Sequence, residues 1–412
     1  MPRWPRLSNS SVRRVGPRAD SVRYRPGNRI KLLRNGAQYF AALEAAIDVA
    51  QREVWLETYI FADDAAGRRI AAAMARAAGR GVKVRALVDG WGAKFYLTSS
   101  LERSLRDAGV ELLKYRPEVS AWQFRSHRLR RLHRKLAHVD GRIAFVGGIN
   151  IIDDMNTRGQ TPPRVDFAVS VEGLLLPAIV YTMQRVWALV QLVQLGASQL
   201  PLFPERHPGN RVGNQTAKFV IRDNLRHRRD IEQGYMAAIR RAKREIIIAN
   251  PYFFPGITFR RALTEAAGRG VAVTLILQAK VEYVLLHFAG RALYGQLLDA
   301  GVVIQEYSKS MLHAKVAVVD DHWATVGSSN IDPYSLLMAR EANVFVRDRE
   351  FAGELRGALV EMIETGAQPV APLHWKTRSR WYKAAIWMAY GIVRLAMGLV
   401  GYGGNEYFVR RR

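Results

Sequence analysis

Hydrophobic and polar positions recur along the chain with an offset of about 190 residues, which indicates a duplicated fold. Three stretches repeat: residues 45–61, 78–90 and 107–115 match residues 237–254, 267–279 and 299–307. The first pair reads AAIDVAQREVWLETYIF and AAIRRAKREIIIANPYFF, and the second reads AGRGVKVRALVDG and AGRGVAVTLILQA. The repeat is therefore the unit in which local structure should be predicted.

Within each copy, helical and strand-like segments alternate. In the first copy the apolar spacing predicts a helix through residues 45–50, a strand over 54–61, a second helix over 67–78 and a strand over 82–88. Gly81 is placed to end the second helix. Alternating helices and strands predict an α/β fold, made of two pseudo-two-fold-related halves that each hold a mixed sheet flanked by helices.

The two copies differ in length at one point. Tyr115 precedes His133 by eighteen residues, whereas Tyr307 precedes His313 by six. The difference falls in a basic insert, residues 116–132. We expect four parts in the chain: a flexible basic arm over 1–27, a first half over 28–205, a second half over 206–370 and a basic amphipathic tail over 371–412.

Two long apolar runs raise the question of membrane contact. Residues 174–195 are interrupted by polar residues, and their apolar positions recur at helical spacing, which favours a packed helix over a membrane span. The tail over 384–400 combines Lys383 and Arg394 with amphipathic aromatic residues. Such a helix is typical of a membrane interface, although packing on the protein or on a second subunit is the alternative.

The charge is large and unevenly placed. The chain has 62 Lys and Arg against 36 Asp and Glu, a net charge of +26, and no cysteine. Residues 1–34, 114–135 and 374–412 hold 26 basic and three acidic residues, which is +23 of that total. This charge predicts a polyanionic partner, either an anionic membrane or nucleic acid. The missing cysteine excludes disulfides, thiolate metal sites and a cysteine nucleophile, and the N-terminus lacks the apolar segment of a secretory signal.

One polar motif, His-x-Lys-x4-Asp, occurs once in each half with identical spacing. Its residues are His133, Lys135, Asp140, Gly147, Gly148 and Asn150 in the first copy, and His313, Lys315, Asp320, Gly327, Ser328 and Asn330 in the second. A single copy would carry little weight, but two copies at one place in a repeat make coincidence improbable. Other histidines, His127, His138 and His322, are expected on the surface or in packing.

The residue types of the motif suit phosphodiester chemistry without a metal. A histidine and a lysine two residues apart lie on one face of a strand and can approach the same oxyanion. The aspartate closes the strand and can anchor the turn or the lysine. The two sets, His133, Lys135 and Asp140 with His313, Lys315 and Asp320, are the expected catalytic residues. The glycine turns can offer backbone N–H groups to phosphate, with Ser328 and the asparagines as further donors. Gly148, where the second copy has Ser328, is expected to leave room for a headgroup.

With these motifs the chain resembles the phospholipase D superfamily, and within it bacterial cardiolipin synthases of the B type. The resemblance covers about residues 28–365. It rests on LHRKL (132–136), FVGGIN (145–150), RDNLRHRRDIE (222–232), ANPYFFPG (249–256) and DDHWATVGSSNIDPYSL (320–336). It implies two α/β halves that face each other and share one active site.

The resemblance also implies a double displacement without cofactor or metal. Family precedent makes His133 the nucleophile and His313 the acid/base, although the sequence itself is nearly symmetric. The residues expected to bind the substrate phosphate are Lys135, Lys315, Asn150, Ser328, Asn330, Gly147, Gly148 and Gly327. Asp166 and Glu341, downstream of the two motifs, are expected to orient the histidines, with Asp153 and Asp332 as alternatives.

The resulting hypothesis is a cardiolipin synthase that moves a phosphatidyl group between phospholipids, with phosphatidylglycerol as donor and expected acceptor. It would sit peripherally on the bacterial inner membrane, on the cytoplasmic side, and nucleic acid is not its expected partner. The expected membrane contacts are Trp122, Phe124, Arg125, Arg128, Arg130, Arg131, Trp387 and Tyr390. A phospholipase D-type hydrolase, a nuclease and a non-catalytic membrane scaffold stay open as alternatives, and so does a homodimer.

Overall fold

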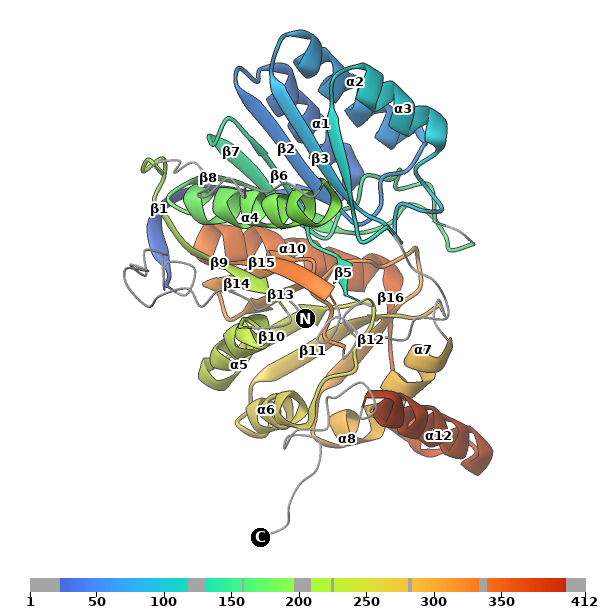
Figure 1. The fold of residues 1–412 in the computed structure, drawn as a ribbon. Helices are drawn as coiled ribbons and strands as arrows, with labels where there is room; N and C mark the ends of the chain where they lie inside the picture. The colour runs from blue at the N-terminus through green and yellow to red at the C-terminus, as the bar shows by residue number, and fades with distance from the viewer. Residues whose placement is uncertain are drawn as a thin grey trace, which may run out of the picture.

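The computed structural model describes residues 23–117, 130–157, 159–195, 209–223, 226–280, 284–332 and 339–397. Two halves with the same order of elements lie one above the other in Figure 1. The first half contains β1 (Arg25–Arg34), α1 (Asn35–Asp48), β2 (Glu53–Thr58), α2 (Ala65–Gly79), β3 (Lys83–Asp89), α3 (Ser99–Asp107), β4 (Glu111–Tyr115), β5 (Arg131–Leu132), β6 (Lys135–Val139), β7 (Ile143–Gly147), β8 (Phe167–Gly173) and α4 (Leu176–Leu195).

The second half largely repeats this order, with two helices in place of α3 and, among the described residues, no strand in place of β5. It adds a strand and two helices at its end. It contains β9 (Gln215–Arg222), α5 (Asp230–Arg241), β10 (Glu245–Ala249), α6 (Ile257–Gly268), β11 (Ala272–Gln278), α7 (Val284–Arg291), α8 (Tyr294–Asp299), β12 (Val303–Tyr307), β13 (Val316–Val319), β14 (Trp323–Gly327), β15 (Ala339–Arg347), α10 (Arg349–Gly366), β16 (Ala367–Pro369), α11 (Pro372–Lys376) and α12 (Arg380–Met397). The predicted duplicated α/β fold is confirmed.

Local sequence explains where the elements start and stop. The side chain of Asp64 caps α2 by accepting a hydrogen bond from the Gly67 N–H at 3.0 Å. Gly81 follows α2 with a φ of +85°, a conformation that glycine adopts readily. The predicted strand over 54–61 ends early, at Thr58, whose hydroxyl donates to the carbonyl of Ile60 at 2.8 Å.

The strands form one mixed sheet that continues through both halves. Its order is β4-β3-β2-β6-β7-β8-β1 in the first half and β9-β15-β14-β13-β10-β11-β12-β16 in the second. β1 pairs antiparallel with β9, so the halves join at their first strands. Reading outward from this junction gives the same series of strands on both sides, which is the pseudo-two-fold relation.

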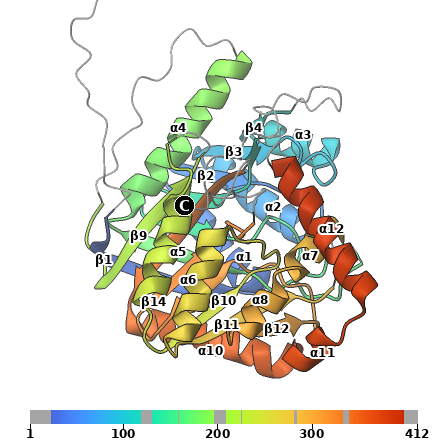
Figure 2. The same cartoon turned by 90° about the horizontal axis from the view of Figure 1, so that it is seen from below.

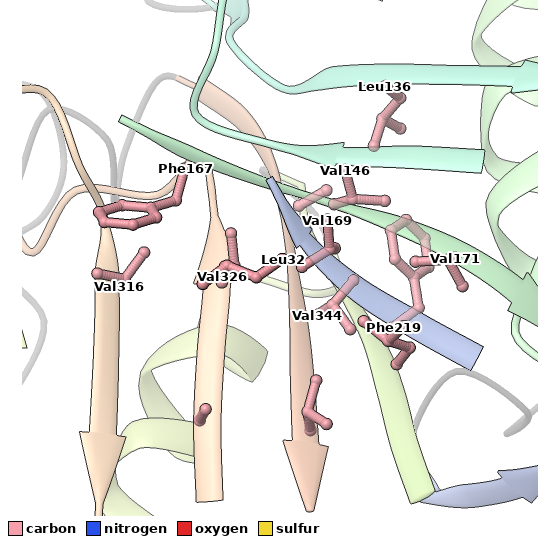
Figure 3. Packing of buried hydrophobic residues seen from close by; sticks show 14 of the residues in the cluster. Leu32, Leu136, Val146, Phe167, Val169, Val171, Phe219, Val316, Val326 and Val344 are labelled. Atoms are coloured by element: carbon pink, nitrogen blue, oxygen red, sulfur yellow. The ribbon is translucent and has the colours of Figure 1, made fainter. Parts of the chain in front are cut away.

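The main hydrophobic core lies between the two halves of the sheet. Buried side chains of β6, β7 and β8 meet those of β13, β14 and β15 there, together with residues of α4 and α10. Figure 3 shows part of this core, in which Phe167 of the first half lies close to Val316 of the second. Separate clusters pack α1, α2 and α3 on the outer face of the first half, and α5, α6 and α8 on that of the second.

α4 is packed on the protein along the predicted stripe. Ile179, Met183, Val186 and Val190 are all at most 5% exposed. By length and composition α4 is the one helix in the described ranges that could span a membrane, and half of its apolar window is buried. Its C-terminal part extends away from the body in Figure 2, where Val193 is 75% exposed.

α12 packs on the protein, which is one of the two alternatives expected for the tail. It lies along α7 (Figure 2) and buries Ile386, Ala389 and Val393 in the second outer core. The apolar residues of α12 are divided between two environments, because Ile386 is buried whereas others are exposed. The exposed large apolar residues of α12 are Trp381, Trp387, Met388, Ile392 and Leu395.

Candidate active site

The two motif histidines lie at equivalent ends of the two halves of the sheet. β6 runs antiparallel to β2, and β2 is parallel to β3 and β4. The start of β6, with His133 and Lys135, is therefore beside the loops that follow β2, β3 and β4. β13 and β10 repeat this geometry for His313 and Lys315. The carboxyl ends of parallel strands are a common place for binding residues in α/β proteins.

The two motifs meet because the chain crosses between the halves. β5 leaves the first half and pairs in parallel with β15 of the second. The backbone N–H of His133 donates to the carbonyl of Arg340 at 3.1 Å, and that of His313 donates to the carbonyl of Val165 at 2.8 Å. Each histidine is thus positioned by the backbone of the opposite half.

The carboxylates cross between the halves in the same way. His133 Nδ1 is 2.9 Å from Glu341 Oε1, and His313 Nδ1 is 2.5 Å from Asp166 Oδ2. Each downstream carboxylate contacts the histidine of the other motif rather than that of its own. Of the alternatives, neither Asp153 nor the buried Asp332 hydrogen-bonds a motif histidine among the described residues. Because Nδ1 is engaged in both rings, Nε2 is the atom that would face a substrate.

The two carboxylates are supported differently. Ser328 donates its hydroxyl to Glu341 Oε2 at 2.5 Å and accepts the N–H of Ala342 at 3.1 Å. At the matching place in the first half, a Cβ on Gly148 would lie 2.3 Å from Asp166 Oδ1. The expectation that Gly148 leaves room for a headgroup is therefore wrong, because the Asp166 carboxylate fills that space.

The glycines and Ser328 are used for packing and do not form a phosphate cradle. The N–H of Gly148 donates to the Phe167 carbonyl, and that of Ser328 donates to the Ala342 carbonyl, both at 3.0 Å. Gly147 and Gly327 lie in strands, where a Cβ would come within 2.5 Å of Ala168 and 2.2 Å of Asn343. These groups have partners within the protein, so the expected backbone donors to phosphate are not offered here.

Asp140 and Asp320 do not belong to the site. Each follows its strand at the end opposite the histidine, and five strand residues separate Lys135 from Asp140 by about 16 Å. Each carboxylate accepts three backbone N–H groups of the turn that begins β2 or β10. The donors are Gln51, Arg52 and Glu53 for Asp140, and Lys243, Arg244 and Glu245 for Asp320. The predicted catalytic role is thus wrong for both residues, whereas the turn anchor is right.

The lysines and asparagines line the region around the histidines. Lys135 Nζ donates to the His133 carbonyl at 2.5 Å, and Lys315 Nζ donates to that of His313. Burial lowers the pKa of Lys135 to about 7. Asn150 accepts the N–H of Ile60 at 3.1 Å, whereas Asn330 Oδ1 is buried without a hydrogen-bond partner among the described residues.

Electrostatics distinguish the two histidine–carboxylate pairs. Burial lowers the pKa of His133, and it lowers that of His313 well below its ordinary value with help from the nearby lysines. Burial opposes ionisation of Glu341, but His133, Lys135 and the Ser328 hydroxyl outweigh it and lower the pKa. Burial instead raises the pKa of Asp166 to about 6. The Glu341 pair therefore holds the more stable negative charge.

Several neighbours of the site were not predicted. The Tyr59 ring centre lies 5.0 Å from that of His133. Arg134, between the motif residues, forms a buried two-point ion pair with Glu57 at 2.6 and 3.0 Å. Arg164 is close enough to depress the pKa of His313. One feature of the sequence could have indicated Arg134 as a residue of the site: the first copy of the motif reads HRK, whereas the second reads HAK.

The expected membrane contacts separate into three groups. Trp122, Phe124, Arg125 and Arg128 lie outside the described residues. Arg130 is half-buried, and the Arg131 side chain is only 15% exposed, 3.8 Å from the buried Asp89, so a membrane role for Arg131 is wrong. Trp387 is 56% exposed, whereas Tyr390 is half-buried with its ring centre 5.3 Å from that of Phe254.

No group of three or more metal-ligating side chains occurs in the ranges that the structure covers. The site is instead a pair of imidazoles, each with a carboxylate on one nitrogen and a buried lysine two residues away. Two cations and two polarised imidazoles can surround one phosphodiester and pass protons to and from its oxygens.

Comparison with solved structures supports the fold. Phosphatidylserine synthase of Haemophilus influenzae superposes with a TM-score of 0.63 at 12% identity, over 90% of this chain and 95% of that one. Polyphosphate kinase of Porphyromonas gingivalis gives a TM-score of 0.55 at 13% identity, over 90% of this chain and 53% of that one. At these identities the likeness concerns the fold alone.

Sequence comparison identifies the family. Cardiolipin synthase B of Escherichia coli K12 is 38% identical over 384 residues, which are 92% of this chain and 91% of that one. Cardiolipin synthase of Geobacillus kaustophilus is 32% identical over 326 residues, which are 76% of this chain and 62% of that one. The family described as cardiolipin synthase, PLD-like domain, matches residues 43–159 and 235–363. The chain therefore belongs to the cardiolipin synthase family of phospholipase D-like enzymes.

Proposed function

We propose that the protein is a phosphatidyltransferase that makes cardiolipin from two molecules of phosphatidylglycerol. The observation that carries the proposal is the crossed pair of histidine–carboxylate contacts, His133 with Glu341 and His313 with Asp166. This arrangement gives one site two imidazoles of fixed tautomer, which a reaction with a covalent intermediate requires. The family membership gives the phospholipid substrate class.

In the first step His133 Nε2 attacks the phosphorus of the donor lipid. A P–N bond forms while the bond from phosphorus to the oxygen of the headgroup glycerol breaks. Protonated His313 gives its proton to that oxygen, so glycerol leaves as a neutral alcohol. Lys135 and Lys315 stabilise the negative charge on the phosphoryl oxygens in the transition state.

In the second step the acceptor completes the transfer. Neutral His313 takes the proton of the acceptor hydroxyl while its oxygen attacks phosphorus. The P–N bond breaks, and its electron pair returns to His133. Two phosphatidylglycerols have then become one cardiolipin and one glycerol, and both histidines are in their starting states.

The assignment of roles rests on the difference between the two pairs. A histidine whose Nδ1 proton is held by an ionised carboxylate is the better nucleophile, and Glu341 is the carboxylate with the lowered pKa. A histidine with a strongly lowered pKa is a strong acid once protonated, which suits the protonation of a poor leaving group. His313 has that property.

The test uses a donor whose leaving group needs no proton, phosphatidyl-p-nitrophenol. We expect His313→Asn to release a burst of about one equivalent of nitrophenolate and to carry a phosphatidyl adduct on His133, detected by intact-protein mass spectrometry. His133→Asn should give neither. A burst from His133→Asn with an adduct on His313 would reverse the roles, and no adduct in either variant would contradict the covalent mechanism.

We further propose that the enzyme rests on an anionic leaflet through α12 and the loop after β3. Residues 372–397 contain five basic and no acidic residues, and the exposed apolar side chains of α12 lie among them. In the first half, Trp91 and Phe95 are 40% and 59% exposed, with Lys94 Nζ within 5.8 Å of both ring centres.

Both surfaces are at the edge of the sheet where the histidines lie. The Trp91 loop follows the carboxyl end of β3, and α7, along which α12 packs, follows the carboxyl end of β11. Exposed aromatic and aliphatic side chains mixed with lysine and arginine are the pattern of an interfacial membrane contact. A lipid entering from the leaflet would therefore reach the site without leaving the interface.

A further inference from the structure

Four arginines lie close to one another beside His133, since the charges of Arg130, Arg131 and Arg340 all act on Arg116. We refer to these four residues as the arginine cluster. The parallel pairing of β5 with β15 places Arg131 opposite Ala339 and Leu132 opposite Arg340. All four arginines are half-buried.

Tyr115 contacts two members of the arginine cluster. Arg340 Nε donates to the Tyr115 hydroxyl at 3.3 Å, and the guanidinium carbon of Arg116 lies 5.5 Å from the Tyr115 ring centre. The cluster is also tied to the site, because the carbonyl of Arg340 accepts the N–H of His133.

Among the residues that the structure describes, the positive charge of the cluster exceeds the nearby negative charge. Asp89 is 3.8 Å from Arg131, but its oxygens also accept backbone N–H groups of Trp91, Gly92 and Leu132. A second buried acid, Glu57, forms an ion pair with Arg134 and is also influenced by the charge of Arg340. Burial lowers the pKa of Arg116, and the other three arginines add to that effect. A partner anion would relieve this repulsion.

Arg116 has two features that point to a ligand. Its Nη1 is buried without a hydrogen-bond partner in the part of the chain that the structure describes. Its backbone has a φ of +50°, in the left-handed region that residues other than glycine and asparagine rarely adopt. Strained backbone of this kind gathers at functional sites, and an unpaired buried guanidinium donor is costly unless an anion completes it.

In the part of the second half that the structure describes, no matching group of arginines follows Tyr307. Tyr307 matches Tyr115 in the repeat, but Ser308, Lys309 and Ser310 follow it, and its hydroxyl is 3.2 Å from that of Ser310. The cationic subsite therefore lies on one side of the pseudo-dyad, which gives a nearly symmetric site two different ends.

From this geometry we propose that the arginine cluster binds the phosphodiester of the acceptor lipid, so that the acceptor is selected as an anionic phospholipid. The inference rests on the proposed function and deepens it. Cardiolipin has two phosphodiesters joined by a three-carbon bridge, and only one of them can lie between His133 and His313. The other needs a second cationic site nearby, and the planar guanidinium fork suits a phosphodiester.

The experiment separates acceptor recognition from chemistry by changing only the acceptor. Vesicles of phosphatidylglycerol are assayed for cardiolipin, and the same vesicles with excess ethanol are assayed for phosphatidylethanol. We expect Arg116→Gln and Arg340→Gln each to lower cardiolipin formation about 10- to 100-fold, as loss of a charge-assisted hydrogen bond predicts. Phosphatidylethanol formation should stay within about twofold of the parent, because ethanol carries no phosphate.

Arg103→Gln is the matched control, since it removes one positive charge from an exposed position of α3; both rates should be unchanged. Thermal unfolding checks that each variant is folded. Equal loss of both products would overturn the inference by placing the donor lipid at the cluster, and normal cardiolipin formation in both variants would also overturn it. If the parent protein makes neither product, the proposed function itself fails, which is a different result.

Discussion

The carboxylates that hold the two histidines differ in their support at one position of the repeat. Ser328 supplies a hydroxyl to Glu341, whereas Gly148 gives the Asp166 carboxylate the space in which it reaches His313. Adding a side chain at position 148 and removing the hydroxyl at position 328 should therefore lower activity for different reasons.

We predict that Gly148→Ala is much more harmful than Ser328→Ala. The new Cβ would lie 2.3 Å from Asp166 Oδ1, so Asp166 must move away from His313, and kcat should fall about 100-fold or more. Ser328→Ala leaves Glu341 in place with one hydrogen bond fewer, and kcat should fall about tenfold. Both are measured as steady-state transfer by the folded protein.

Gly79→Ala, in α2, is the control for the glycine variant. Nothing lies within 4 Å of a Cβ at that position, so activity should not change. A Gly148→Ala enzyme with full activity would contradict the close approach of Asp166 to position 148.

The buried Lys135 predicts how activity depends on pH. Its pKa of about 7 means that the ammonium is charged below pH 7 and neutral above it. The first step also needs protonated His313, whose pKa is well below its ordinary value, so kcat/KM should already decline with rising pH at lower pH. The negative transition state needs the charged form of Lys135, so the decline should become steeper above about pH 7. A bound phosphodiester raises this pKa, so the alkaline limb of kcat should lie at higher pH than that of kcat/KM. Profiles with a soluble phosphodiester between about pH 5 and pH 9 measure both limbs. A kcat/KM that stays flat above pH 7 would contradict the role of Lys135.

At the residue scale the sequence predicted which histidines and carboxylates come together but not how they pair. Spacing alone placed Asp166 and Glu341 with the motifs that precede them, since nothing in a one-dimensional repeat shows that β5 and β15 exchange partners between the halves. The roles of Asp140, Gly147 and Gly148 were also misjudged. Each supports the sheet, and motif membership cannot separate support from chemistry.

Among the elements, the turn that precedes β2 depends on Asp140 and the turn that precedes β10 depends on Asp320. The φ angles of the two aspartates are +54° and +53°. Each carboxylate accepts three backbone N–H groups from the connection between a helix and the strand that follows it. The identical spacing of the motif in the two halves therefore partly reflects the length of one strand. The histidine lies at one end of that strand, and the aspartate that anchors the turn lies at the other.

We predict that Asp140→Ala destabilises the fold without slowing the chemistry. It leaves three N–H groups unpaired and puts alanine in the left-handed region, so the free energy of unfolding should fall by about 3 kcal/mol. In Asp140→Asn, the asparagine tolerates that backbone conformation and keeps one acceptor oxygen. The free energy of unfolding should therefore fall by less, about 1 kcal/mol. Urea unfolding gives the stabilities, and kcat/KM is measured where each variant is folded. A large loss of kcat/KM at unchanged stability would restore a catalytic role to Asp140.

The succession of elements was predictable because strands and helices repeat with clear apolar periodicity, as β2, α2 and β3 illustrate. The pairing of β5 with β15 was not, since β5 has two residues and no periodicity of its own. The exposed face of α12 was also uncertain, because a helix apolar on most sides gives no sign of which side meets the protein.

For the whole molecule, the position of the apolar surfaces predicts how the enzyme meets its substrate. We expect the double variant Ile392→Ser, Leu395→Ser to reduce co-sedimentation with phosphatidylglycerol vesicles about tenfold, since both side chains face outward from α12. Turnover of a soluble phosphodiester should remain unchanged.

Val49→Ser is the control for the membrane variant. Val49 is 56% exposed, and it precedes β2, at the edge of the sheet opposite the histidines. It should leave vesicle binding intact. Equal vesicle binding by all three proteins would show that α12 does not face the membrane.

The crossed carboxylates also determine when chemistry can begin during the life of a chain. The first half is synthesised first, with His133, Lys135 and Asp166, but Glu341 follows His133 by 208 residues. Under the proposed mechanism His133 has no orienting partner until β15 has been made and has paired with β5. A ribosome-bound or truncated chain folding beside the membrane would therefore leave the surrounding lipids intact, and the enzyme becomes active only when its own fold is complete.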